Sequence, residues 1–76
     1  MALSNDEIEI AQNLITNLQP NNYELEEIYG EHWQAIEGPT SFGRLFKESV
    51  LDGKLRGIRS IGRTAENHQL YRVFRV

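Results

Sequence analysis

The side chains that could catalyse a reaction are few in this 76-residue chain. Histidine occurs at His32, beside Trp33, and at His68 in a polar segment, and cysteine is absent. A nucleophile needs an activating base, and this base needs a group that orients it. Neither Ser41 nor Ser49 stands in such a context. We therefore expect no enzymatic activity and no catalytic residue.

A metal site is not predicted either. Glu31-His32 and Glu66-Asn67-His68 place ligand types next to one another rather than at the spacing of a ligand set, and the chain offers no thiolate. We expect neither a metal nor another cofactor.

Charge is divided unevenly along the chain. Residues 1–40 hold eight acids and no Lys or Arg, whereas residues 41–76 hold all eight cations and three acids. The formal net charge of −3 hides this separation. Such asymmetry points to a polyanionic partner, because clustered cations raise the local potential whatever the net charge is. The alternative is that the two halves pack together and neutralise each other.

Binding to duplex DNA is the leading functional hypothesis. Arg44 and Lys47 lie three residues apart on one face of an expected helix, where side chains can reach base edges in a major groove. Cations of an expected hairpin would meet phosphates, and its loop would touch the minor groove. The candidate DNA-binding residues are Ser41, Arg44, Lys47, Lys54, Arg56, Arg59, Arg63, Asn67, His68 and Arg72.

A protein-interaction module is the alternative hypothesis. An acidic surface could bind a basic partner, such as a nucleic-acid enzyme, and act as an inhibitor or adaptor. A molecule with separated charges could also self-associate head to tail. The candidate residues for this role are Asp6, Glu9, Glu24, Glu27 and Glu31.

The elements that must position these residues begin with a helix over residues 4–18. Ser4 and Glu7 match a capping box, and apolar residues then recur at steps of three and four up to Leu18. Pro20 closes the segment. Residues 23–36 are expected to form a short strand followed by a helix, in which Trp33 is a core residue rather than a platform for base stacking.

The third helix is expected over residues 41–52. Thr40 or Ser41 would cap it, and Gly53 would end it. Gly43 lowers helix propensity, so we expect a close backbone contact at this position. Leu55–Ile61 and Leu70–Arg75 then predict two antiparallel strands, with a bulge or strand end marked by Gly57 and Gly62. The predicted common core contains Ile15, Trp33, Phe42, Phe46 and Phe74.

Three helices followed by a hairpin, with a short strand after the first helix, predict an α+β fold of the winged helix-turn-helix type. The third helix would be the recognition helix, and residues 63–68 would form the tip of the wing. In this arrangement the basic half of the chain coincides with the two elements that face DNA. Residues 1–76 are expected to form one domain, with the ranges 4–18, 23–36, 41–52 and 55–75.

A spaced pattern from Tyr23 to Tyr71 covers about two-thirds of the chain. Its parts are Tyr23-Glu24-Leu25-Glu26-Glu27-Ile28-Tyr29-Gly30-Glu31-His32-Trp33, Phe42-Gly43-Arg44-Leu45-Phe46-Lys47, Gly57-Ile58, Gly62 and Asn67-His68-Gln69-Leu70-Tyr71. The pattern resembles a family of small bacterial and phage proteins classified as a domain of unknown function, with Leu-Phe-Gly-x-x-Trp, Leu-Gly-Arg-x-Phe-Lys and a closing Asn and Tyr. This resemblance implies a winged-helix-like fold, and it brings no established activity or site residues.

The length and composition are typical of one small globular domain. No apolar run approaches the roughly 20 residues that a membrane span needs, and no basic-then-apolar leader is present. We therefore expect a cytoplasmic protein with no membrane partner.

Overall fold

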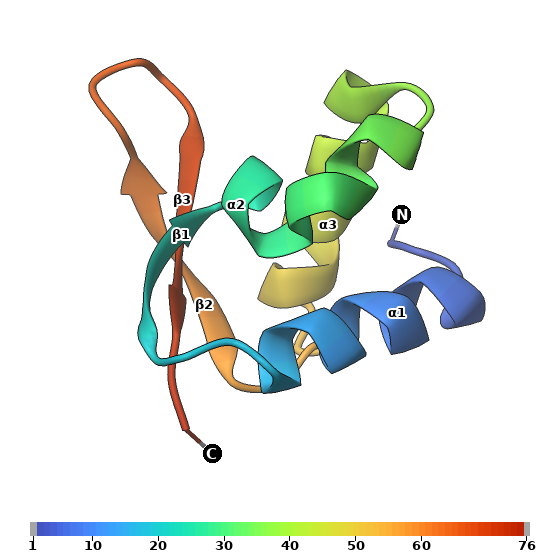
Figure 1. Ribbon diagram of the computed structural model, residues 1–76, viewed down its shortest axis with the longest axis horizontal. Helices are drawn as coiled ribbons and strands as arrows, with labels where there is room; N and C mark the ends of the chain where they lie inside the picture. Colours follow the sequence, from blue (N-terminus) through green and yellow to red (C-terminus); the bar gives the residue numbers. More distant parts are fainter. Residues whose placement is uncertain (1, 76) are drawn as a thin grey trace.

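The helices and strands follow one another in an α+β arrangement, as the sequence predicted. A computed structural model describes residues 2–75. The elements are α1 (Asn5–Thr16), β1 (Asn21–Glu24), α2 (Leu25–Tyr29), the 3₁₀ helix η1 (Gly30–Ala35), α3 (Pro39–Leu51), β2 (Ile58–Arg63) and β3 (Gln69–Val73). The three strands form one antiparallel sheet in the order β1-β3-β2, with the helices packed against it (Figure 1). The expected α+β class is confirmed.

The start of α1 is the capping box that the sequence predicted. The Glu7 backbone N–H donates to Ser4 Oγ at 3.3 Å, and the Ser4 N–H donates to Glu7 Oε1 at 2.9 Å. The helix ends at Thr16 instead of Leu18. Asn17 is the C-cap residue, and Pro20 disfavours helical backbone at Gln19, so the helix cannot resume there.

The segment after α1 contains a strand and two short helices. β1 begins at Asn21, two residues before the expected start, because Asn21 and Asn22 pair with Val73 and Arg72 of β3. α2 ends at Tyr29, and the following residue, Gly30, has a φ of +53°, which suits glycine better than other residues. The expected strand and helix are therefore present, and the helix is divided at this glycine.

α3 begins at Pro39, which corrects the expectation that Thr40 or Ser41 caps a helix starting at residue 41. Gly38 is the N-cap residue, in a left-handed conformation with φ +60°, and no side chain caps the helix. Proline is well suited to the first helical position because its φ is preset and it needs no N–H partner there. Thr40 and Ser41 therefore lie inside the first turn.

The hairpin pairs later in β2 than expected. The predicted antiparallel pairing of the two segments is confirmed, but its bounds differ: the ladder joins Ile58–Arg63 to Gln69–Val73 rather than Leu55–Ile61 to Leu70–Arg75. Leu55 is buried ahead of the strand. The register shifts between Ser60 and Gly62, which is the bulge that the glycine predicted.

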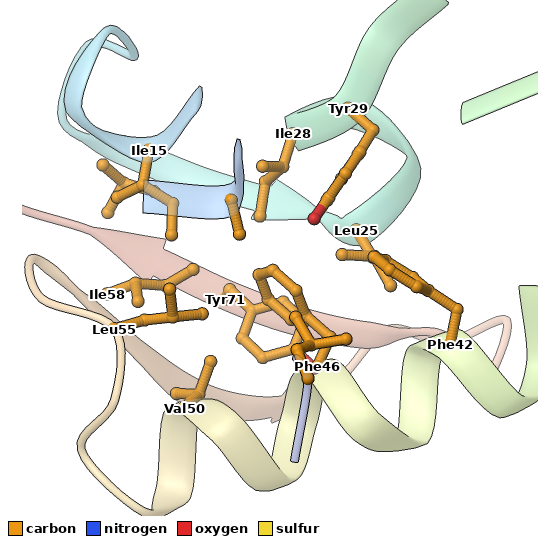
Figure 2. Packing of buried hydrophobic residues seen from close by; sticks show 13 residues of the cluster. Ile15, Leu25, Ile28, Tyr29, Phe42, Phe46, Val50, Leu55, Ile58 and Tyr71 are labelled. Carbon is orange, nitrogen blue, oxygen red and sulfur yellow. The ribbon is translucent and has the colours of Figure 1, made fainter. Parts of the chain in front are cut away.

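The core lies between the inner face of α3 and the sheet, and is closed by α1 and α2. Phe46 and Tyr71 are fully buried, with ring centroids 5.2 Å apart, and lie side by side in Figure 2. Ile15 and Phe42 are buried as predicted, and Trp33 is half-buried against this cluster. Phe74 is 40% exposed, which corrects its place in the predicted core. Successive residues of an extended segment point to opposite sides, and the preceding residue, Val73, faces the core.

Candidate functional site

A groove of about 550 Å³ separates the first turns of α3 from the β2–β3 hairpin. We call it the α3–hairpin groove. Figure 1 shows the start of α3 and the β2–β3 loop at the same end of the molecule, whereas the C-terminus lies at the other end. Both walls of the groove carry cations from the basic half of the chain.

The α3 wall is one stripe of the helix. Thr40, Gly43, Arg44 and Lys47 line the groove, at the steps of three and four residues that share a helical face. Phe46, on the opposite side of α3, is fully buried in the core. The helix thus directs Arg44 and Lys47 into the groove because its apolar face is held against the sheet.

The hairpin wall depends on the bulge in β2. Ser60 pairs with Tyr71, whose side chain faces the core. In a regular strand the side chains after Ser60 would alternate between the outer and the inner face of the sheet, and Arg63 would lie on the outer face. The shift instead pairs Gly62 with Leu70 and Arg63 with Gln69. One inserted residue exchanges the faces of the side chains that follow it. Arg63 is therefore turned to the inner side of the sheet, where it lines the groove.

The Arg63 guanidinium is held in place by neutral side chains. Its Nη1 donates to Asn67 Oδ1 at 2.8 Å. The Gln69 amide, oriented with its oxygen toward Arg63, accepts from Nε at 2.9 Å and from Nη2 at 3.2 Å. Asn67 has a left-handed φ of +68°, which asparagine tolerates in turns. The cation is thus positioned without being neutralised.

His68 joins the loop to the end of β1. Its Nδ1 lies 2.7 Å from Glu24 Oε1, and both residues line the groove. The hydrogen bond to the Glu24 carboxylate raises the pKa of His68 above its ordinary value of 6.5, and the charges of Glu24, Glu66 and Glu26 act in the same direction. The groove therefore contains a titratable group at the hairpin end.

The two halves of the chain do not neutralise each other through direct ion pairs in the part that the structure describes. Within residues 2–75, no Lys or Arg nitrogen lies within 4.0 Å of an acidic oxygen. The one contact between a basic and an acidic side chain in this range is that of His68 with Glu24. Two acids, Glu24 and Glu26, line the α2 side of the groove. Arg44 interacts electrostatically with Glu48 one helical turn away, but none of Arg44, Lys47 and Arg63 forms a direct ion pair among residues 2–75.

The structure divides the predicted DNA-binding set between several places. Arg44, Lys47, Arg63, Asn67 and His68 line the α3–hairpin groove. Ser41 is exposed on α3, outside the groove lining, and Lys54 and Arg56 lie between α3 and β2.

Arg59 and Arg72 lie on the outer face of the sheet. They are direct cross-strand partners, and their neighbours Ile58, Tyr71 and Val73 face the core. The Arg72 Nη1 donates to Asn22 Oδ1 at 3.2 Å. These two cations are therefore on the opposite side of the sheet from Arg63.

The acidic candidates are also dispersed. Asp6 and Glu9 are exposed on α1, and Glu31 is exposed on η1. Glu24 contacts His68, while Glu27 Oε1 accepts the Glu24 backbone N–H at 2.8 Å.

Sequence reasoning missed an apolar hollow of about 230 Å³ on the side of α1 and η1. It is lined by Ile10, Ile36, Phe42 and Tyr29, with Glu7 and Glu37 beside them. Ile10 is 56% exposed, so this hollow has an apolar side chain at its rim. Burial, followed by the charge of Glu7, raises the pKa of Tyr29 well above its usual range.

Gly43 does not mark the close backbone contact that we expected. A Cβ at this position would meet Leu25 Cδ2 at 3.7 Å, which is ordinary van der Waals contact. Gly43 and Tyr71 both line the groove, and sequence reasoning assigned neither to the site. The stripe Thr40-Gly43-Arg44-Lys47 is the signal that could have included Gly43.

The described residues contain neither a cluster of metal ligands nor a membrane-spanning helix. Residues 2–75 hold no cluster of three His, Asp or Glu side chains suited to a metal ion. None of the helices in the same range is long and apolar enough to cross a membrane.

The comparison with protein families gives a match over nearly the whole chain. Residues 9–72 match the family described as a domain of unknown function (DUF1413). The chain belongs to this family. The match confirms the expectation that the chain belongs to a family of unknown function, and the matched range begins within α1. In this DUF1413 domain, every residue of the α3–hairpin groove lies inside the matched range. No curated protein and no solved structure matches the chain.

Proposed function

We propose that this DUF1413 domain is a DNA-binding domain of the winged-helix type. α3 is its recognition helix, and the β2–β3 loop is its wing. The phosphodiester backbone of a duplex lies in the α3–hairpin groove, between Arg44 and Lys47 on one wall and Arg63 on the other. The domain acts as a small regulatory protein through this contact.

The arrangement of elements supports this proposal. Three α-helices and the short 3₁₀ helix η1 precede the hairpin, and β1 completes a three-stranded sheet beside it. α3 presents its polar stripe at the end of the molecule where the β2–β3 loop extends. A helix that enters a major groove and a loop that follows the neighbouring backbone need this relative placement.

The single observation that carries the proposal is the groove itself. It gathers Arg44, Lys47 and Arg63 from two elements, and none of the three is paired with an acid among residues 2–75. Cations that are positioned but not neutralised attract phosphates and release counterions when they bind. Asn67 and His68 add hydrogen-bonding groups at the loop.

Fluorescence anisotropy with a labelled mixed-sequence duplex tests the proposal. At about 50 mM salt we expect saturable binding, and the logarithm of the affinity should fall linearly with the logarithm of the salt concentration. No binding to the duplex at this salt concentration would contradict the proposed function.

Two double variants with equal charge changes test the location of the interface. Arg44→Ala/Arg63→Ala removes cations of the groove, whereas Arg59→Ala/Arg72→Ala removes the same number from the outer face of the sheet. We expect the first to lower both the affinity and the salt slope, and the second to change them much less. Equal losses would show that only net charge matters and would place no interface in the groove.

A second candidate function, binding to a basic protein, is favoured by the hollow beside α1. An exposed Ile10 next to Ile36, with Glu7 and Glu37 near them, suits an apolar side chain flanked by Lys or Arg. The test is an NMR titration with a peptide of alternating Leu and Arg. Amide shifts centred on Ile10 and Ile36, lost in Glu7→Gln/Glu37→Gln, would support this function. Shifts spread evenly over all acidic residues would contradict it.

A further inference from the structure

Tyr71 has a hydroxyl group that is buried without a hydrogen-bond partner. The residue is 0% exposed, and within residues 2–75 no donor or acceptor is bonded to its Oη. Burial raises the pKa of Tyr71 to about 12, so the group is a neutral donor at ordinary pH. Tyr71 also belongs to the lining of the α3–hairpin groove. An unpaired polar group therefore lies beneath the floor of this groove.

Tyr71 and Gly43 each make the folded protein less stable than phenylalanine and alanine, respectively, would make it at the same positions. A phenylalanine at position 71 would bury the same ring without the cost of an unpaired hydroxyl. An alanine at position 43 would improve helix propensity, and its Cβ would meet Leu25 Cδ2 at an ordinary 3.7 Å. Two destabilising residues in the lining of one groove are typical of a binding site, where stability is reduced in favour of function.

The first turn of α3 opens on the same groove. Pro39 and Thr40 are in its lining, and the helix has neither a side-chain cap nor an acid in its first turn. The amide of Thr40 and the positive end of the helix dipole therefore face an anion without competition from a capping carboxylate.

We propose that the floor of the groove is a subsite for one backbone phosphate of nucleic acid, which accepts a hydrogen bond from the Tyr71 hydroxyl. This inference rests on the proposed function and adds to it the group that the groove binds. The phosphate lies over Gly43, near the Thr40 amide, with Arg44 and Lys47 on one side and Arg63 on the other. A side chain at position 43 would occupy part of this space.

Access to the hydroxyl needs a small movement. Tyr71 is fully covered in the free protein, so a phosphate oxygen meets its hydroxyl only when a flexible side chain of the lining turns aside. Arg44 and Lys47, which line the same groove, are the long side chains of its α3 wall. The same movement brings their charges around the phosphate.

The decisive variant is Tyr71→Phe, which removes one oxygen atom. We expect it to melt at the same or a higher temperature than the wild type, and to bind a mixed-sequence duplex about tenfold more weakly. Tyr23→Phe is the matched control, because the Tyr23 hydroxyl bonds the Gln19 carbonyl at 2.7 Å and Tyr23 is not in the groove lining. The control should bind DNA like the wild type. Equal affinities of Tyr71→Phe and the wild type would overturn the inference and leave the proposed function intact.

Gly43→Ala is an independent second variant. We expect it to raise the melting temperature while lowering the affinity for the duplex, since the added methyl group stands where the phosphate binds. A gain in stability with unchanged affinity would overturn the placement of the phosphate over Gly43.

An NMR titration with inorganic pyrophosphate tests the phosphate subsite independently of DNA binding. We expect pyrophosphate to shift the NMR amide signals of Thr40 and Gly43, with smaller shifts in Tyr71→Phe. Such shifts in a protein that binds no duplex would show a phosphate site without nucleic acid, and would overturn the nucleic-acid assignment. No shifts at these amides, together with unchanged DNA binding by Tyr71→Phe, would overturn the subsite itself.

Discussion

His68 Nδ1 and Glu24 Oε1 lie 2.7 Å apart, although the two residues are separated by 44 positions in the sequence. The contact joins the β2–β3 loop to the junction of β1 and α2. It therefore fixes one end of the loop relative to the helices on the other side of the α3–hairpin groove. Protonation of His68 turns this hydrogen bond into an ion pair.

The His68–Glu24 pair predicts a dependence of stability on pH. The pKa of His68 is raised above 6.5, first by the hydrogen bond to Glu24 and then by the Glu24 charge. A histidine with a raised pKa in the folded state stabilises the protein fully below the unfolded pKa, and this contribution is lost as pH rises through the folded pKa. We expect Glu24→Gln to lower the pKa of His68 in an NMR titration. It should also reduce the loss of melting temperature as the pH rises from below 6.5 through the raised pKa of His68. An unchanged His68 titration would contradict the pairing.

Ser49 is a structural residue, and we expect its substitution to lower the stability of the fold. It is 0% exposed, its Oγ accepts the Leu3 N–H at 2.9 Å, and it donates to the Leu45 carbonyl at 2.8 Å. Ser49→Ala leaves the buried Leu3 N–H without a partner, so we expect a loss of about 1–3 kcal/mol in the free energy of unfolding. Urea denaturation measures this loss. Ser41→Ala, at an exposed position, is the control and should change little.

We expect Phe46→Ala to lower the stability of the fold more than any other single substitution in the core. The fully buried ring of Phe46 packs against Tyr29, Phe42 and Tyr71. Phe46→Ala should cost about 3–5 kcal/mol, which is most of the stability of a domain of this size. Thermal melting followed by circular dichroism should show a largely unfolded variant at room temperature. Phe74→Ala, at a residue that is 40% exposed, should keep a transition close to that of the wild type.

Arg44 and Arg63 face the same groove from α3 and from the end of β2, so we expect similar effects on DNA binding when either is removed. Arg44→Ala and Arg63→Ala should each weaken binding to all sequences alike and reduce the salt slope by about one unit. Competition anisotropy with several duplexes measures both effects. A loss for Arg44→Ala that is confined to one duplex would instead assign this side chain to a base edge, where a bidentate contact is worth roughly 1–3 kcal/mol.

We expect that replacing Arg59, the cross-strand partner of Arg72, stabilises the fold. They are direct cross-strand partners on the outer face of the sheet, and like charges in this position repel each other. Arg59→Thr removes the repulsion and keeps a β-branched residue, so we expect a higher melting temperature at low salt. The difference should shrink at high salt, where exposed charges are screened. Lys54→Thr, outside the sheet, is the control; a difference that persists at high salt would contradict the electrostatic cause.

Local spacing in the sequence predicted much of the fold. The capping box of Ser4 and Glu7 marked the start of α1, and the apolar spacing of Phe42 and Phe46 predicted which side of α3 is buried. These features depend on neighbours within one or two helical turns, so the sequence contains all the information they need. The position of Arg44 and Lys47 on a shared helical face followed from the same periodicity.

The tertiary structure alone decided which cations share a site. The bulge between Ser60 and Gly62 turns Arg63 into the groove, and pairing in the sheet leaves Arg59 and Arg72 on the opposite face. The face of each strand residue depends on register, and one inserted residue reverses the alternation for those that follow. The partner of Glu24 and the unpaired hydroxyl of Tyr71 likewise depend on segments distant in sequence, because tertiary packing determines which side chains come within hydrogen-bonding distance.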